Sequence, residues 1–249
     1  MKPFIVVFCA CALWLSAATA LAGPFGPTGY LQASDSPFAA IDFSGGYFYL
    51  ETFEDHALNT PGAAGTTGGV ASGAIDMSFH DSVDADDGSI DGLGFQGDNW
   101  YDPGAKTGFT FNAAVLGNLP TYAGFVWTDG PAATAVAFTA WGADGVTVVC
   151  SIPAGAVFGD NSHNGGTAED KFLGCSDAGG ISRIEASNTL GPDIEVDHLQ
   201  YGWAPSLSVP EPAVLSLFVL GGVLTLRRRI APGRLKAAPT KNSTATPRP

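Results

Sequence analysis

Apolar and polar residues alternate, with a period of two, through much of the middle of the chain. The pattern is clear in Phe109–Phe111, in Val136–Trp141 and in Ile194–Asp197, where acidic side chains take the outward positions. Such alternation is typical of strands that bury one face, and Gly, Pro, Asn and Asp, which favour turns, separate the runs. The strands that this pattern predicts are Tyr47–Glu54, Ile75–Phe79, Phe109–Asn112, Gly124–Thr128, Ala135–Trp141, Val146–Ile152, Ile181–Ser187 and Ile194–Tyr201.

These strands predict an all-β fold over residues 47–204, because few stretches there show the 3.6-residue period of a helix. Ala143–Gly145 stands between two of the runs and has the composition of a hairpin turn. About eight short antiparallel strands in a segment of this length predict a β-sandwich of jelly-roll type. Residues 23–46 are expected to form a looser entry segment before it.

An apolar run at the N-terminus breaks the alternating pattern. Lys2 precedes the run Phe4–Leu15, and Ala20 and Ala22 then form a small-x-small cleavage site. This order of charge, apolar run and small residues is that of a secretory signal peptide, so residues 1–22 are expected to be removed on export.

A second apolar run, Ala213–Leu226, lies near the C-terminus and contains no charged residue. As a helix of 14 residues it would span about 21 Å, short of the roughly 30 Å hydrocarbon core, so a buried core helix is the alternative. Arg227, Arg228 and Arg229 follow directly; they suit a cytoplasmic membrane face and can extend the span by snorkelling. The sequence therefore favours a transmembrane helix over residues 213–226.

A short proline motif precedes this helix. Its residues are Val209, Pro210, Glu211 and Pro212. The order of motif, apolar run and arginine cluster resembles the C-terminal sorting signal of PEP-CTERM proteins, here over residues 205–229. The resemblance implies that exosortase cuts near the motif, that the precursor is anchored in the inner membrane, and that the product reaches the outer surface or the extracellular matrix. Residues 230–249 extend beyond the usual end of such signals and read as a disordered basic tail.

The segment between the two signals is strongly acidic. It holds 23 acidic residues and only Lys106, Lys171 and Arg183 as basic ones, which makes its formal net charge −20. Repulsion from phosphate excludes nucleic acid as a partner. Two interpretations of this charge stay open: solubility, or binding of a cation such as Ca²⁺.

The acidic residues are densest in one Gly-containing loop. Its aspartates are Asp81, Asp84, Asp86, Asp87 and Asp91. Calcium accepts six to eight oxygen ligands in loose geometry, so such a loop can form a cage, although the spacing is not that of an EF-hand. The alternative is a solvated acidic loop; the hypothesis is that Asp84, Asp86, Asp87 and Asp91 supply ligands to Ca²⁺.

A second, weaker resemblance involves the strand near Thr52–Asp55 and the last predicted strand. These segments resemble the paired first and last strands of jelly-roll carbohydrate-binding modules. The resemblance implies that Glu54 and Asp197 hold a structural calcium ion between the two strands.

Two cysteines remain after export, because Cys9 and Cys11 lie within the signal peptide. Cys150 and Cys175 are predicted to form a disulfide in an oxidising compartment. Closing a loop of this size contributes about 3.5 kcal/mol in the chain-entropy model. The alternative is two separate buried thiols.

Aromatic residues are candidates for sugar binding, because sugar rings stack on exposed aromatic faces. Trp100 and Tyr101 lie in a Gly- and Asp-rich segment and form the best candidate for an exposed, glycan-binding pair. Trp127 and Trp141 lie in predicted strands, where such residues more often belong to the core.

No catalytic motif stands out. The histidines lack a zinc-type spacing, no G-x-S-x-G turn occurs, and acids are too abundant for any carboxylate pair to be informative. The sequence predicts a non-catalytic surface or matrix protein that is stabilised by Ca²⁺ and binds exopolysaccharide. The alternatives are a structural or adhesion protein without a small ligand and a secreted glycan hydrolase.

Overall fold

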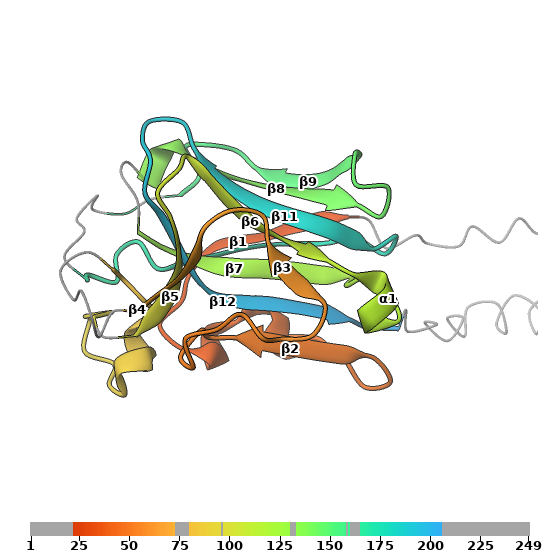
Figure 1. The fold of residues 1–249 in the computed structure, drawn as a ribbon, viewed down its shortest axis with the longest axis horizontal. Coiled ribbons are helices and arrows are strands. Elements are labelled where there is room, and N and C mark those ends of the chain that lie inside the picture. Colours follow the sequence, from red (N-terminus) through yellow and green to blue (C-terminus); the bar gives the residue numbers. More distant parts are fainter. Residues whose placement is uncertain are drawn as a thin grey trace, which may run out of the picture. The chain divides into compact units, whose positions relative to one another are not determined.

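The computed structural model describes residues 22–72, 80–95, 97–129, 133–157, 159 and 165–205. Over these residues the chain forms two antiparallel β-sheets that pack face to face (Figure 1). The all-β sandwich predicted from the alternating pattern is confirmed at this level.

Several predictions from the sequence lie outside the described residues. They are the signal peptide up to residue 21, the strand Ile75–Phe79, the sorting signal from residue 206 onward with its apolar helix, and the basic tail. Within the described ranges, no helix has the length and apolar character needed to cross a bilayer.

The larger sheet contains seven strands in the described residues, and six of them follow the order β1-β10-β7-β12-β5-β4. The strand β2 also pairs with β12, next to β5, so the long β12 has β7 along one edge and β5 and β2 in succession along the other. The bounds are β1 Gly23–Gly29, β2 Tyr47–Glu51, β4 Gly69–Ser72, β5 Asp98–Asp102, β7 Tyr122–Asp129, β10 Lys171–Ser176 and β12 Ile194–Trp203.

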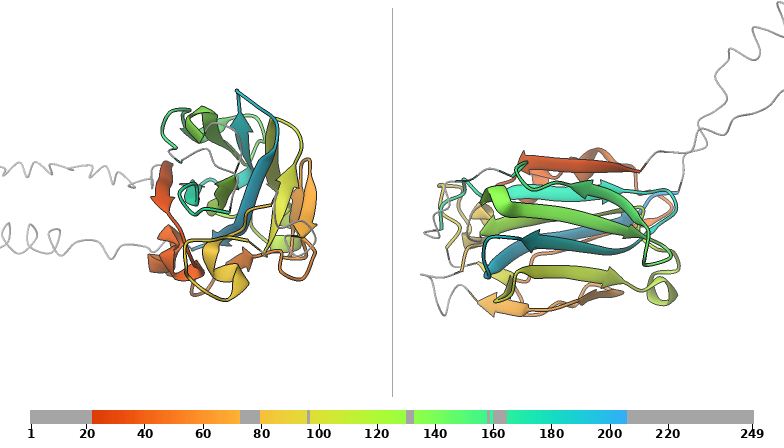
Figure 2. Two further views of the ribbon diagram at one scale, coloured as in Figure 1. Left: turned by 90° about the vertical axis from the view of Figure 1, so that its left-hand side faces the viewer. Right: turned by 90° about the horizontal axis from the view of Figure 1, so that it is seen from above.

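The smaller sheet contains five strands in the described residues, in the order β3-β6-β11-β8-β9, and Figure 2 shows the sandwich from two further sides. Its strands are β3 Ala63–Gly65, β6 Lys106–Phe111, β8 Val136–Gly142, β9 Val148–Ile152 and β11 Ile181–Asn188. The helical elements are short: α1 Ala113–Leu116, and the 3-10 helices η1 Ala33–Asp35, η2 Pro37–Ala40, η3 Asp84–Asp87 and η4 Ala133–Ala135.

Each predicted strand in the described residues overlaps an observed one, from β2 to β12. The predicted turn at Ala143–Gly145 does join β8 to β9, with the Gly142 amide donating to the Thr147 carbonyl at 2.8 Å. The pattern missed β1, β3, β4, β5 and β10. These strands are short, Gly-rich or buried on both faces, so their apolar residues do not alternate.

The entry segment is more ordered than the sequence predicted. Gly23–Gly29 forms β1, which pairs with β10 with an irregularity between Phe25 and Thr28, and η1 and η2 follow it. Gly and Pro disfavour strands in general, but an edge strand tolerates proline because its outward amides need no partner. Tertiary pairing with β10 therefore overrides a weak local preference.

The main core lies between the two sheets. Phe109 of β6, Phe125 of β7 and Phe138 of β8 are fully buried there and meet edge to face, with ring centroids 5.4 to 6.1 Å apart. Trp127 and Ile184 are also fully buried in this cluster.

A second apolar cluster covers the outer face of the larger sheet. Val126 of β7 and Phe172 of β10 are cross-strand partners on that face, and they pack against Tyr30, Phe38 and Val83. The last three residues come from the entry segment and from the loop before η3. As a result, the face of β12 that the sequence predicted to be solvent-exposed is covered.

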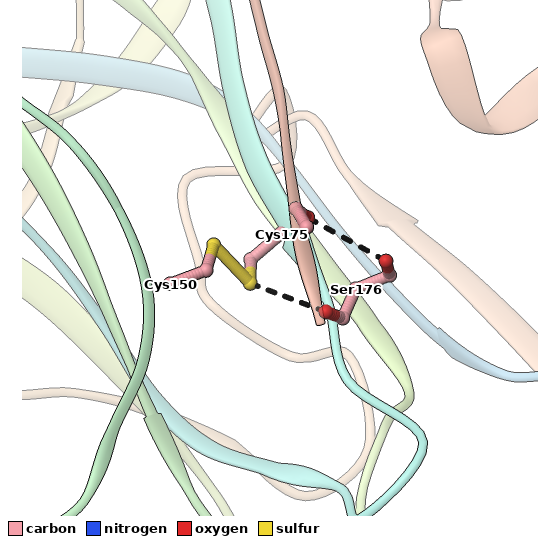
Figure 3. The surroundings of a disulfide bond; sticks show 4 residues. Cys150, Cys175 and Ser176 are labelled. Carbon is pink, nitrogen blue, oxygen red and sulfur yellow. Dashed lines mark hydrogen bonds between the residues drawn. A yellow bond between two sulfur atoms is a disulfide. The ribbon is translucent and has the colours of Figure 1, made fainter. Parts of the chain in front are cut away.

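A disulfide joins the two sheets. Cys150 lies on β9 and Cys175 on β10, and the structure places their sulfur atoms in one bond, with the Cα atoms 6.3 Å apart (Figure 3). Next to it, the Ser176 hydroxyl donates to the Gly23 carbonyl at 3.5 Å, so the same stretch of β10 also holds β1.

Candidate metal centre

A bulge in β12 creates the local geometry of the candidate metal centre, which consists of Asp86, Asp197 and His198. The register of β12 against β7 shifts between Asp197 and Gln200, and His198 has a φ of 44°. Left-handed backbone is strained for a residue other than glycine, and such strain collects at functional sites. The bulge lets Val196 and Leu199 both face the main core. Asp197 and His198 instead face residues 80–95, which we call the covering loop.

The covering loop closes over Asp197 through its own backbone. The Val83 amide donates to Asp197 Oδ2 at 3.0 Å, and the Ala85 amide donates to the Leu31 carbonyl at 3.0 Å. Asp84, which is fully buried, accepts hydrogen bonds from the amides of residues 91, 92 and 93 at 3.1 to 3.2 Å. The loop is thus held in one shape, and η3 presents Asp86 to β12.

Asp86 meets Asp197 and His198 at the centre. One ligand atom from each of these three side chains lies within 4.8 Å of the other two. Asp86 Oδ2 is buried and has no hydrogen-bond partner in the described part of the chain. Burial raises the pKa of Asp197 well above its usual value, and the Asp86 carboxylate raises it further. Two buried carboxyls in contact need either a shared proton or a cation.

A chain of hydrogen bonds from Ser36 to Tyr30 supports one tautomer of His198. Ser36 Oγ accepts from the Phe38 amide at 3.0 Å, so its own proton goes to Gln200 Oε1. Gln200 Nε2 donates to the Tyr30 hydroxyl at 2.8 Å, and that hydroxyl then donates to His198 Nδ1 at 2.9 Å. Burial raises the pKa of Tyr30, which keeps the phenol protonated as this chain requires.

In this tautomer His198 is a hydrogen-bond donor to Asp86 and not a metal ligand, although its ring lies close enough to both acids to supply a ligand atom. With Nδ1 accepting from Tyr30, the ring proton sits on Nε2 and is donated to Asp86 Oδ1 at 3.0 Å. A cation at this place would be held by oxygen atoms of Asp86 and Asp197. Oxygen ligands suit a hard cation such as Ca²⁺ and make zinc a poor fit.

Glu54, the other predicted ligand, lies near Asp86 but outside the cluster that Asp86 forms with Asp197 and His198. The resemblance to carbohydrate-binding modules implied that an early strand lies next to the last one, and β2 does pair with β12, with Leu199 opposite Glu51. Glu54 Oε1 accepts from the Asp98 amide at 2.6 Å. Burial raises the pKa of Glu54 to about 7, and the Asp86 carboxylate adds to the effect. Asp86 and Asp197, which the sequence placed in two separate sets of ligands, thus come together, whereas Glu54 is not part of that cluster.

The other predicted loop ligands serve the loop itself. Asp87 accepts from the amide and hydroxyl of Ser89, and Asp91 accepts from the Leu93 amide at 3.2 Å. Asp84 holds backbone amides as described above. Short aspartates next to glycine readily bond to nearby amides, and the cage of Asp84, Asp87 and Asp91 around Ca²⁺ stays a prediction.

The predicted glycan-binding pair is also placed differently. Trp100 lies on β5 and is only 8 % exposed; its ring packs on Phe53 and Phe109, and its Nε1 donates to the Thr67 carbonyl at 2.9 Å. The prediction that Trp100 is exposed in a loop is wrong, because a strand too short to show alternation draws it into the core. Tyr101 is partly exposed and donates its hydroxyl to Asp193 at 2.7 Å.

The other tryptophans of the prediction differ from each other. Trp127 belongs to the main core, as expected. Trp141 is partly exposed on β8, where the Arg183 guanidinium stacks over the ring at 3.7 Å from its centroid.

Sequence reasoning missed Tyr30 and Gln200, which control the centre through His198. Neither residue lies in a motif, and they are 170 positions apart. Only the covering of the sheet by the entry segment brings them together.

Comparisons with known proteins add no relative: no family model matches the chain, and no similar curated protein or solved structure was found.

Proposed function

We propose that this chain is an exported, non-catalytic surface or matrix protein that exosortase sorts and that Ca²⁺ stabilises. The observation that carries the proposal is the order, at one end of the chain, of the motif Val209–Pro212, the apolar run Ala213–Leu226 and three arginines. The signal peptide at the other end agrees with export. The partners are exosortase and, before processing, the inner membrane.

The sandwich is of jelly-roll type in this proposal. Strands β5 to β12 supply four neighbours to each sheet, in the orders β10-β7-β12-β5 and β6-β11-β8-β9. Successive strands cross between the sheets except at the β8–β9 hairpin. An eight-stranded double sheet with long crossings is the arrangement of a jelly roll, to which β1 to β4 are additions.

Calcium has a structural role in this proposal. The buried oxygen atoms of Asp86 and Asp197 join the covering loop to the middle of β12. A cation between them would compensate two charges that are otherwise costly to bury. The ion would then hold the covering loop, and with it the second apolar cluster, on the sheet.

The role at the surface is structural rather than sugar-binding. What supports this choice is that Trp100, one of the two residues suggested for stacking on a sugar ring, belongs to the core.

The experiment is fractionation of a Gram-negative host that carries exosortase, expressing the full chain with a tag in the folded domain. We expect the wild-type chain to lose its C-terminal segment and leave the inner membrane. Replacement of Pro210, Glu211 and Pro212 by alanine should leave the full-length precursor in the inner membrane. Pro232→Ala, in the tail, is the matched control and should be processed normally. Full-length chain in the cytosol with both termini intact would refute the proposal.

A further inference from the structure

A second group of acids lies beside the centre but shares no ligand with it. β10, β7 and β12 are neighbours in the larger sheet, and each carries an acid at the same end. Asp170 directly precedes β10, Asp129 ends β7, and Glu195 of β12 is the cross-strand partner of Asp129. Partners across a ladder face the same side of the sheet, so Asp129 and Glu195 lie together, and Asp170 lies one position beyond the pair Lys171–Trp127 at the same strand ends.

The covering loop brings a fourth acid to this group. The Asp81 amide donates to Glu195 Oε2 at 2.6 Å, which fixes the residue over the strand ends. After burial itself, the charges that raise the pKa of Asp81 to about 10 are, in decreasing order, those of Asp170, Glu195, Asp129 and Glu169. A carboxyl in such surroundings needs a proton or a cation to be stable.

Two of these acids have no hydrogen bond to either carboxylate oxygen. Asp81 is 2 % exposed and Asp170 is 0 % exposed, and all four of their Oδ atoms lack a hydrogen-bond partner in the described ranges. Buried polar atoms in folded proteins are almost always paired, so four unpaired oxygens on two acids indicate a missing ligand. Lys171 and the nearby Asp84 amide lower the pKa of Asp170, but burial outweighs them, and neither Oδ atom is within hydrogen-bond geometry of that amide.

Asn99 contributes a fifth unpaired oxygen. This residue of β5 is fully buried, and its Nδ2 donates to the Asp81 carbonyl at 2.8 Å and to Glu195 Oε2 at 3.0 Å. These two acceptors determine which amide atom is nitrogen. Its Oδ1 is therefore an oxygen next to Asp81, and it has no partner among the described residues. Carboxylate and amide oxygens together are the donor set that Ca²⁺ prefers.

We propose that Asp81, Asp170 and the Asn99 amide oxygen hold a calcium ion that pins the covering loop to the ends of β10, β7 and β12, while Glu195 positions Asn99 and the Asp81 amide. This inference rests on other residues than the Asp86–Asp197 centre and needs neither that centre nor export. The two sites use the same loop and the same strand: Asp81 and Glu195 belong to one, Asp86 and Asp197 to the other. Each ion would therefore order the loop for the other.

The test is a calorimetric titration of Ca²⁺ into the full chain after removal of metal with EDTA. We expect two equivalents to bind the wild-type chain, and one to bind the variant Asp81→Asn/Asp170→Asn. Asp86→Asn/Asp197→Asn should lose the other equivalent. The exposed pair Asp42→Asn/Asp144→Asn is the charge-matched control and should bind as the wild type does.

A second readout separates loss of a site from loss of the fold. In EDTA, Asp81→Asn/Asp170→Asn should melt at or above the temperature of the wild type, because it removes two buried acids without partners. In Ca²⁺ the order should reverse, since only the wild type gains from the ion at this site. Undiminished Ca²⁺ binding by this variant, or no binding of Ca²⁺ to the wild type, would overturn the inference. If only the Asp86→Asn/Asp197→Asn variant lost an equivalent of Ca²⁺, the first centre would be supported and the second site would be overturned.

Discussion

At the scale of single residues, the hydroxyl of Tyr30 controls the acidic centre without touching an acid there. It accepts from Gln200 and donates to His198 Nδ1, which leaves the His198 ring proton for Asp86. A histidine beside two acids resembles a zinc ligand set. With the Tyr30 proton donated to His198 Nδ1, the centre offers only the oxygen donors of Asp86 and Asp197.

Removal of that hydroxyl is the test at this scale. Tyr30→Phe leaves both the Gln200 amide and His198 Nδ1 without a partner in a buried place, which should lower the free energy of unfolding by about 2 kcal/mol or more. Tyr101→Phe, which removes an exposed hydrogen bond to Asp193, should cost less than about 0.5 kcal/mol. Urea unfolding measures both, and equal losses would contradict the assigned network.

At the scale of elements, β5 shows where reasoning from periodicity ends. Its sequence Asp-Asn-Trp-Tyr-Asp has a single core residue between polar ones, so it reads as a polar turn. In the structure it lies between β4 and β12, and every residue except Tyr101 is buried. The sheet around it therefore decides that Trp100 faces the core and Asn99 the second site.

The burial of Trp100 makes a quantitative prediction. Trp100→Ala should destabilise the full chain by about 3 to 5 kcal/mol, because it leaves a large cavity beside Phe53 and Phe109. Trp141→Ala is the matched control; it removes a partly exposed ring stacked on Arg183 and should cost about 1 kcal/mol. Comparable midpoints for the two variants in urea would mean that Trp100 is not a core residue.

At the scale of the whole molecule, the fold buries acidic side chains although the domain already carries a large negative charge. The segment between the two signals carries a net charge of −20, yet Asp81, Asp170 and Asp197 are buried. Burial raises the pKa of each of them. In the absence of metal, the folded state therefore binds protons that the unfolded state releases above pH 4.

The expected result in the absence of metal is a free energy of unfolding that decreases as pH rises. In EDTA, the stability from these protons is complete below the unfolded pKa near 3.8 and is lost as pH rises towards the folded value, about 10 for Asp81. Each such carboxyl costs about 1.4 kcal/mol per pH unit within that window. The melting temperature in EDTA should fall between pH 5 and 8.

Calcium should change this dependence, because it replaces the protons and binds better as they leave. The gap between the melting temperatures in Ca²⁺ and in EDTA should therefore widen as pH rises from 5 to 8. Parallel curves, or a melting temperature in EDTA that does not fall, would argue against buried acids that await a cation.

The sequence by itself determined the class of this fold and several of its parts. Alternation predicted β2, β6, β7, β8, β9, β11 and β12, because a strand with one buried face leaves a period of two in the chain. Turn chemistry predicted the β8–β9 hairpin. Residue type singled out Asp86 as a candidate ligand for a cation, and the resemblance to carbohydrate-binding modules singled out Glu54 and Asp197.

Only the tertiary structure decided how the acids are combined and where they are buried. Asp86 meets Asp197, and Asp81 lies near Asp170, across separations of about a hundred residues that no local pattern records. The entry segment and the covering loop turn the outer face of β12 into an interior, and the bulge at His198 aims Asp197 at Asp86. Periodicity in the sequence reports how many faces of a strand are buried. Which segments then cover the outer face of the sheet depends on contacts that form only after the sheet exists.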